Sequence, residues 1–429
     1  DVAIEGLIHD TRLVTPSAMF LTFKGQHSDG HDHLSDAKKA GASSALVSRA
    51  VDCDLPQVQV PDVLTAAGDL AAAWRASLDV QVVGITGSNG KTSVKEMVLA
   101  ILQDHGQTLA TEGNYNNEIG VPITLSRLSD KHEFAVIEMG AAREGDIRYL
   151  SHLVRPTVGI LTNAGPAHLE SFGSIDTIVR TKGELFATLS DDGWAVINAD
   201  SSYVRHWRDL AAHCHSLHFG IDHEADFGAI VASNYQMGDA IDVQTPEGIV
   251  SLILPVPGRH NVSNALAAIA ACFALGVAPA QAANSLSKLK SVSQRLQIHR
   301  PVEELTVIDD SYNANPTSME AGLEVLSHYQ KAQWLVIGDM LELGETSEAM
   351  HRELGQLARG KGIDKLFACG PLTRASVKAF GDQGQWFESQ NELIQALLAN
   401  QPRPLSILVK GSRGMRMDRV VSALLEEAK

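Results

Sequence analysis

The sequence predicts an α/β protein divided into domains, of which the larger ones are built on mostly parallel sheets. Apolar, strand-like runs alternate with amphipathic helical segments, and this alternation restarts near residue 300. The chain has 429 residues, which exceeds the ~100–200 residues of an ordinary domain. We place the joints near residues 80 and 296, which gives segments 1–79, 80–296 and 297–429.

The first segment mixes short β-like runs with an alanine-rich helical stretch, Ala66–Ala76. The second opens with a buried-strand pattern, Val80–Ile85, which precedes several glycines and a helix from about Thr92. Apolar side chains of that helix recur at i, i+3, i+4 and i+7, the spacing of one helix face. The next expected strands are Phe134–Ile137, Val158–Thr162 and Trp194–Asn198.

The third segment repeats this rhythm, so we expect a second doubly wound α/β domain. A final helix, about Met417–Glu427, carries apolar residues on one side. The expected strands are Thr306–Asp309, Gln333–Ile337, Lys365–Ala368 and Ser406–Val409.

The composition disfavours several classes of protein function. The net charge of −16 disfavours a general nucleic-acid binder, although local Lys and Arg can still bind small anions inside a cleft. No apolar run approaches the ~18 residues of a membrane span, and we recognise no signal peptide. The four cysteines form no CxxC pair, so reduced thiols in a cytoplasmic protein are expected.

The strongest functional pattern is Gly84-Ile-Thr-Gly-Ser-Asn-Gly-Lys-Thr92, between an expected strand and an expected helix. Backbone N–H groups of such a loop point at phosphate oxygens, and the helix N-terminus adds positive potential. Lys91 can reach the β- and γ-phosphates, and Thr92 can hold Mg²⁺. The loop is a GxxGxxGKT variant, since Ile85 stands where the strict pattern has glycine. A glycine-rich turn without a nucleotide is the alternative.

Polar residues follow the neighbouring strands. Glu138 ends the strand after the loop, where a carboxylate can hold Mg²⁺ beside the phosphates or simply face solvent at a turn. His168 follows the next strand, and Lys182 lies in a helical pattern; either is more often structural or solvated. The acidic run Glu342, Glu345 and Glu348 is interpreted as a solvated face.

Two further segments allow two interpretations each. The segment 259–264, with two asparagines before an alanine-rich helix, could cap that helix or bind a base or ribose. The segment 309–316 places two acids and a tyrosine after a strand, which makes a good turn or a nucleotide or metal rim.

In this order the motifs resemble the Mur ligases over essentially the whole chain. The resemblance rests on GITGSNGKTS, Glu138 in IEMGA, His168 in NAGPAHLE, Lys182 in TKGEL, Asn264 in HNVSNALAA, Arg295 in QRLQ and Asp310 in DDSYNANP. It implies a small UDP-binding first domain, a central ATPase domain, and a Rossmann-like third domain that closes over both. The segments DSYNANP and 410–413 are most similar to the member that adds D-alanyl-D-alanine to UDP-N-acetylmuramoyl-tripeptide.

The resemblance also implies roles for individual residues. Catalysis would use Lys91, Glu138, His168 and Lys182. Two Mg²⁺ ions would be held by Thr92, Glu138, His168 and Lys182, with Lys182 carbamylated. ATP would contact Gly87, Ser88, Asn89, Gly90, Lys91, Thr92, Ser93, Asn264, Arg295, Asp310 and Tyr312. The other substrates would contact Asp10, Thr11, Arg12, Lys24, Gly25, Asn114, Asn116, Asn117, Asn313, Lys410, Ser412 and Arg413.

These residues predict a ligase that activates a substrate carboxylate as an acyl phosphate and transfers it to an amine. The expected substrates are ATP, UDP-N-acetylmuramoyl-tripeptide and D-alanyl-D-alanine, and the expected state is a monomer. A dipeptide ligase of the same family or a folylpolyglutamate-synthase-like enzyme would share the phosphate loop and Lys182. A nucleotide-dependent switch is a further alternative, but it gives the third domain no obvious use.

Overall fold

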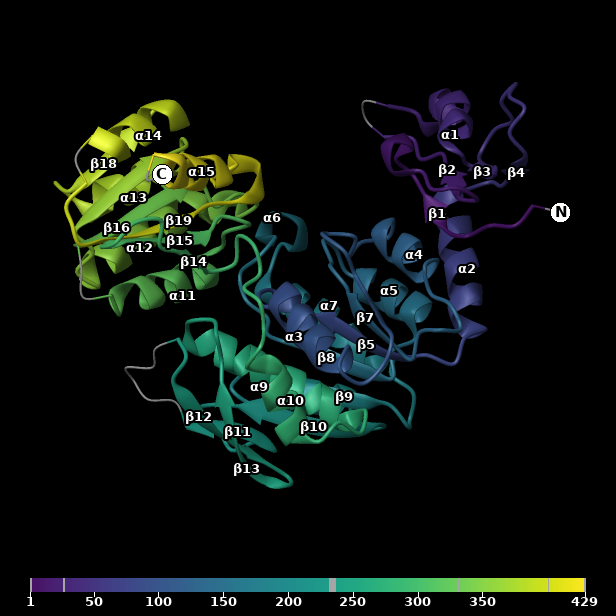
Figure 1. The fold of residues 1–429 in the computed structure, drawn as a ribbon, viewed down its shortest axis with the longest axis horizontal. Helices are drawn as coiled ribbons and strands as arrows, with labels where there is room; N and C mark the ends of the chain where they lie inside the picture. Colours follow the sequence, from purple (N-terminus) through teal and green to yellow (C-terminus); the bar gives the residue numbers. More distant parts are fainter. Residues whose placement is uncertain (1, 26–27, 231–236, 330–331, 400, 428–429) are drawn as a thin grey trace.

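The computed structural model describes residues 2–25, 28–230, 237–329, 332–399 and 401–427. It contains three separate sheets, and each falls within one of the three sequence segments. In Figure 1 the purple N-terminal part and the yellow-green C-terminal part lie on opposite sides above the central part. The exact domain limits stay a prediction.

The N-terminal sheet has four parallel strands in the order β1-β2-β3-β4. Its elements are β1 (Leu7–Ile8), η1 (Thr11–Leu13), β2 (Met19–Leu21), η2 (Gly30–His33), α1 (Leu34–Ala40), β3 (Ser44–Val47), β4 (Gln57–Gln59) and α2 (Val63–Ala76). Helix α2 connects two cores, because Val63 and Ala67 pack in the N-terminal core and Ala71 packs in the central one.

The central sheet has nine strands in the order β13-β12-β11-β10-β9-β8-β5-β7-β6. Its strands are β5 (Gln81–Thr86), β6 (Thr108–Ala110), β7 (Phe134–Glu138), β8 (Val158–Leu161), β9 (Trp194–Asn198), β10 (His215–Gly220), β11 (Phe227–Ile230), β12 (Ala240–Thr245) and β13 (Gly248–Ile253). Its helices are α3 (Lys91–Leu102), α4 (Gly120–Leu125), α5 (Asp146–Val154), α6 (Leu169–Phe172), α7 (Ile175–Ala187), α8 (Val204–Leu210), α9 (Arg259–Ala274) and α10 (Pro279–Leu286).

The strand order reverses at β5, since β7 pairs with one side of it and β8 with the other, both in parallel. A crevice forms at such a switch point beyond the carboxyl ends of the strands. Side chains of β5 alternate between two cores: Val83 and Ile85 pack with α3 and α9, and Val82 packs on the opposite face. The alanines of α9 are buried between α3 and the sheet, so these elements approach closely.

The C-terminal sheet has six strands in the order β14-β15-β19-β16-β17-β18, and β14 alone runs antiparallel to its neighbour. Its strands are β14 (Gln297–His299), β15 (Leu305–Asp310), β16 (Ala332–Gly338), β17 (Lys365–Cys369), β18 (Gly384–Phe387) and β19 (Leu405–Lys410). Its helices are α11 (Pro316–Ser327), η3 (Gly344–Thr346), α12 (Ser347–Gly360), α13 (Thr373–Phe380), α14 (Gln390–Ala399), η4 (Arg413–Met415) and α15 (Asp418–Glu426).

The named strand and helix predictions agree with the structure to within a few residues at each end. The antiparallel strands β12 and β13 were not predicted. They form a hairpin in which alternate residues of β12 are buried, and they extend the sheet at its edge rather than continuing the parallel order. Within the described residues, no helix is both long and apolar enough to cross a membrane.

Candidate active site

One cavity of about 1000 Å³ lies at the switch point of the central sheet and is also lined by residues of the C-terminal part. We call it the central cavity. It gathers most of the predicted site. The lining includes Ser88, Asn89, Gly90, Lys91, Thr92, Ser93, Asn114, Asn116, Asn117, Glu138, His168, Lys182, Asn264, Arg295, Asp310, Tyr312, Asn313, Lys410, Ser412 and Arg413.

The phosphate loop connects β5 to α3 in a conformation that requires glycine. Gly87 has φ +151°, and an added Cβ there would lie 1.9 Å from the Thr162 hydroxyl. Gly90 has φ +82°, and an added Cβ would lie 2.5 Å from the Asn264 side-chain oxygen. Helix α3 begins at Lys91, directly after Gly90. Its N-terminus therefore faces a narrow, glycine-lined cradle suited to phosphate oxygens.

Lys91 and Thr92 lie at the start of α3, directly after the phosphate loop. Lys91 is half-buried, and its ammonium donates to the Gly87 carbonyl oxygen at 2.7 Å. Burial lowers the pKa of Lys91, and the nearby Glu138 carboxylate partly opposes this. The Thr92 hydroxyl donates to Glu138 at 2.9 Å and accepts from Arg295 at 3.2 Å. A cationic side chain, a hydroxyl and a carboxylate thus meet at the start of α3.

Glu138 is held from two sides. Asn116 donates its amide to the second carboxylate oxygen at 2.8 Å. The Glu138 backbone N–H donates to the Thr111 hydroxyl at 3.0 Å. These contacts orient a buried carboxylate toward the phosphate loop, which confirms its placement beside that loop.

His168 and Lys182 line the same cavity from the segments after β8. The His168 imidazole contacts the carboxylate of Glu342, which comes from the C-terminal part. Lys182 is buried in α7, and burial followed by repulsion from Lys91 lowers its pKa well below the ordinary lysine value. Glu342, Glu345 and Glu348 are exposed, which agrees with their interpretation as a solvated face, although Glu342 also lines the cavity and contacts His168.

The C-terminal part contacts the phosphate loop directly. Asn315 caps α11 with its side-chain oxygen and donates its amide to the Asn89 side-chain oxygen at 2.7 Å. The Tyr312 ring lies under the Arg295 guanidinium, 4.1 Å from the ring centroid. Since Arg413 lies 5.4 Å from the same centroid, the ring sits among cations in this structure.

Some predicted residues find partners within the protein. Lys410 is buried and donates to Asp310 at 2.6 Å and to the Asn313 carbonyl oxygen at 2.9 Å. Ser412 is buried as well, and its hydroxyl accepts from the Leu341 N–H at 2.8 Å. Arg413 keeps an exposed side chain in the same rim. The assignment of these residues to substrate stays a prediction.

The five predicted residues of the N-terminal part do not line the central cavity. Asp10 accepts from the Arg12 backbone N–H and pairs with the Arg12 guanidinium, which lowers the Asp10 pKa to about 2. Thr11 begins the short helix that Asp10 caps. Lys24 bridges to Asp29 through the backbone. Gly25 donates its N–H to Ser28 in the same turn.

Three residues in or near the cavity were not predicted individually. Asn163 accepts from the Asn89 N–H at 3.0 Å and donates to its carbonyl at 3.1 Å, so it holds the phosphate loop. The sequence signal that could have identified Asn163 is its position directly after β8. His260 is next to Asp310 and Lys410, and burial lowers its pKa to about 4. Asn315 was visible only as a turn residue.

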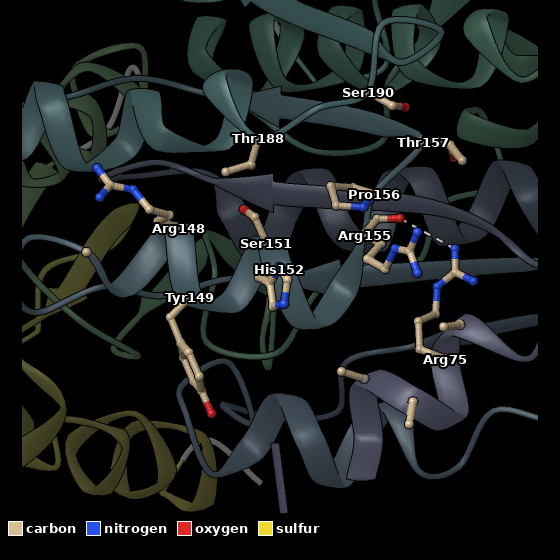
Figure 2. A pocket seen from close by; sticks show the side chains of 14 residues that line it. Arg75, Arg148, Tyr149, Ser151, His152, Arg155, Pro156, Thr157, Thr188 and Ser190 are labelled. Atoms are coloured by element: carbon tan, nitrogen blue, oxygen red, sulfur yellow. Dashed lines mark hydrogen bonds between the residues drawn. The ribbon is translucent and has the colours of Figure 1, made fainter. Parts of the chain in front are cut away.

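A second hollow of about 1280 Å³ lies between α2 and α5, and we call it the α2–α5 hollow. Figure 2 shows that Arg75 comes from α2 and that Arg148, Tyr149 and His152 come from α5. The Arg75 guanidinium donates to the carbonyls of Leu78, Val80 and Val154. Arg148 pairs with Glu184 at 3.3 Å.

Comparison with known proteins identifies the family. The description "Mur ligase middle domain" matches residues 85–272, and "Mur ligase, glutamate ligase domain" matches residues 294–413. The chain belongs to the Mur ligase family. The UDP-N-acetylmuramoyl-tripeptide–D-alanyl-D-alanine ligase of Escherichia coli strain K12 is 42% identical over 99% of this Mur ligase and 95% of that protein.

Solved structures of Mur ligases share the whole fold. A crystal structure of MurF from Acinetobacter baumannii has a TM-score of 0.90 and 34% identity, and the match covers 98% of this chain and 93% of that one. A MurF ligase from Thermotoga maritima, solved in complex with ADP, has a TM-score of 0.89 and 26% identity over 100% and 99% of the two chains.

The residues of this Mur ligase fit a nucleotide and a hard cation. Helix α3 begins directly after the phosphate loop, so its first backbone N–H groups can donate to phosphate oxygens. The Thr92 hydroxyl oxygen and a Glu138 carboxylate oxygen lie 2.9 Å apart. Both are suitable ligands for Mg²⁺, which prefers oxygen.

Proposed function

We propose that this Mur ligase uses ATP to join D-alanyl-D-alanine to UDP-N-acetylmuramoyl-tripeptide, which forms the pentapeptide precursor of peptidoglycan. The convergence of the phosphate loop, Glu138, Lys182 and the C-terminal residues on one cavity supports this function. The E. coli relative of that name matches 99% of the chain. ATP and a UDP-linked substrate place the proposed reaction in the cytoplasm.

The proposed reaction has two steps. A carboxylate oxygen of the tripeptide attacks the γ-phosphorus of ATP, and ADP leaves. The amine nitrogen of D-alanyl-D-alanine then attacks the acyl carbon of the acyl phosphate, loses a proton, and phosphate leaves. The first step brings two anions together, so it needs positive charge at the transition state. Lys91 and Arg295 supply it from the protein.

Thr92 and Glu138 would hold one Mg²⁺, and His168 with a carbamylated Lys182 would hold a second; both ions would neutralise phosphate charge. Within the part of the chain that the structure describes, no three His, Cys, Asp or Glu side chains could hold a metal. The remaining ligands would therefore come from the nucleotide and from Lys182. The lowered pKa of Lys182 favours the neutral amine, which is the form that reacts with CO₂.

The remaining contacts follow from the placement of each residue. Asn264 would contact the adenine, as the family resemblance implies; it lines the central cavity, and its side-chain oxygen lies close to Gly90 of the phosphate loop. Stacking of the base on Tyr312 requires Arg295 to leave the ring face that it covers. Asp310 would lie near the ribose. The UDP end would bind the N-terminal residues, of which Arg12 has an exposed side chain.

The decisive experiment incubates the protein with ATP, Mg²⁺, UDP-N-acetylmuramoyl-tripeptide and D-alanyl-D-alanine, and omits one component at a time. We expect phosphate release only with the complete mixture, and a product heavier by one dehydrated dipeptide. Turnover with a folate and glutamate instead, or with a UDP-N-acetylmuramoyl-dipeptide and an amino acid, would replace the proposed substrates. ATP hydrolysis that requires neither the tripeptide substrate nor D-alanyl-D-alanine would contradict ligase activity.

A further inference from the structure

Two segments from different parts of the chain meet beside the central cavity. His168 immediately precedes α6, and Glu342 lies in the segment before η3, which contacts α6. The Glu342 carboxylate contacts Nδ1 of His168. The Glu170 backbone N–H also donates to the Glu342 carbonyl oxygen at 3.3 Å. The contact between the two side chains is therefore backed by a backbone hydrogen bond.

Both residues have a backbone conformation that is unusual for a side chain of their size. His168 has φ +55° and Glu342 has φ +64°. Such conformations are strained and persist where the surroundings hold them, commonly at functional sites. An incidental surface pair has no need of two strained residues. The strain indicates that the contact has a positional purpose.

A histidine that binds a cation uses one ring nitrogen for it and usually donates the proton on the other nitrogen to a carboxylate. In this structure Glu342 contacts Nδ1, which leaves Nε2 for a cation. Among the described residues, Glu342 is the one carboxylate that forms an ion pair with His168. Glu342 therefore occupies the place of the orienting partner.

We propose that Glu342 is a positioning residue for His168, and that the C-terminal part supplies it. The carboxylate orients the imidazole so that Nε2 faces the cavity. Because Glu342 and His168 lie in different parts of the chain, the second cation site is complete only when these parts are in contact. This inference rests on the proposed function, which assigns His168 to that site. The affinity for the second cation would therefore report whether the central and C-terminal parts are in contact.

The test measures Mn²⁺ binding to the full chain in the presence of ADP, by the electron paramagnetic resonance signal of free Mn²⁺. We expect Glu342→Gln to weaken one of two bound ions about 10- to 100-fold, the usual cost of losing such a partner. Glu345→Gln is the matched control, because Glu345 is exposed and lies in the same segment. An equal loss in Glu345→Gln, or no loss in Glu342→Gln, would overturn the inference.

A double-mutant cycle tests whether Glu342 acts through His168. In a His168→Ala background, Glu342→Gln should weaken Mn²⁺ binding less than about two-fold further. If Glu342→Gln weakened Mn²⁺ binding as strongly in the His168→Ala background as in the wild type, Glu342 would act independently of His168. Wild-type protein that binds only one Mn²⁺ would also overturn the inference. These binding measurements do not involve the amide-forming reaction, so their failure is distinct from failure of the proposed function.

Discussion

The two hollows described above differ in character. The α2–α5 hollow has about 1280 Å³ and the central cavity about 1000 Å³. In the α2–α5 hollow, Arg75 donates to backbone carbonyls, one of which is the Arg155 carbonyl oxygen drawn in Figure 2, and Arg148 pairs with Glu184. In the central cavity, Lys182 is buried with a strongly lowered pKa, and a glycine cradle faces a helix N-terminus.

The comparison teaches that the residues lining a hollow, and not its presence alone, indicate an active site. Arg75 anchors α2 to the central domain. Its guanidinium donates to backbone carbonyls and so holds two parts of the chain together. In the central cavity, burial of Lys182 costs free energy, and a role in folding does not account for that cost. Four predictions sharpen this contrast, ordered by their expected effect on turnover.

Lys91→Ala should lower turnover by about 10³-fold or more, because it removes a phosphate clamp at the transition state. Phosphate release with all substrates present measures the effect. Arg148→Ala, in the α2–α5 hollow, is the control and should stay within about two-fold of wild type. A Lys91→Ala enzyme that keeps more than about a tenth of the wild-type rate would contradict the assignment.

Lys182→Met should lower turnover by at least about 10²-fold and yet stabilise the protein by about 1 kcal/mol near neutral pH, because it removes the cost of burying a lysine amine below its ordinary pKa. The folded-state pKa of Lys182 lies below its unfolded value. The unfolded chain therefore binds more protons between these two pKa values, and wild-type stability rises with pH in that window. The advantage of Lys182→Met should shrink accordingly.

Thermal unfolding in CO₂-free buffer at several pH values measures this second prediction. CO₂ is excluded so that wild-type Lys182 carries a free amine. A Lys182→Met protein that is less stable than wild type at every pH would show that the lysine is not strained.

Asn315→Asp should raise the KM for ATP about ten-fold with little change in thermal stability. The carboxylate can still cap α11, but it cannot donate to Asn89 and it repels phosphate. Asn315→Ala, which loses the cap as well, separates the two roles through its lower thermal midpoint. An unchanged KM in Asn315→Asp would show that this contact does not support nucleotide binding.

Arg75→Met should leave turnover within about two-fold and lower the free energy of unfolding by about 2–3 kcal/mol, because buried carbonyls lose their donors. Urea unfolding and steady-state kinetics on the same preparation measure both. A large loss of turnover without a loss of stability would give the α2–α5 hollow a functional role, and the contrast between the two hollows would fail.

The sequence could predict the features that depend on local order. The phosphate loop is fixed by a strand, glycines and a helix in direct succession, and Glu138 by the strand that it ends. Glu342 could not be predicted in this way. Its partner His168 belongs to another domain, and an acidic run by itself has the pattern of a solvated surface. The partners of Lys410, which are Asp310 and Asn313, could not be predicted because they lie 100 and 97 residues away in the sequence, although in the same domain.

The alanines of α9 restrict how the nucleotide site can evolve. Ala265, Ala267 and Ala268 are fully buried where the helix passes α3, and the same helix carries Asn264. Because these side chains are fully buried in the same core as α3, a larger side chain there would disturb both α3 and Asn264. If the proposed roles of the phosphate loop and Asn264 hold, a substitution at these positions would alter contacts to the base and to the phosphates together, so a change in base preference alone would have to come from the C-terminal residues.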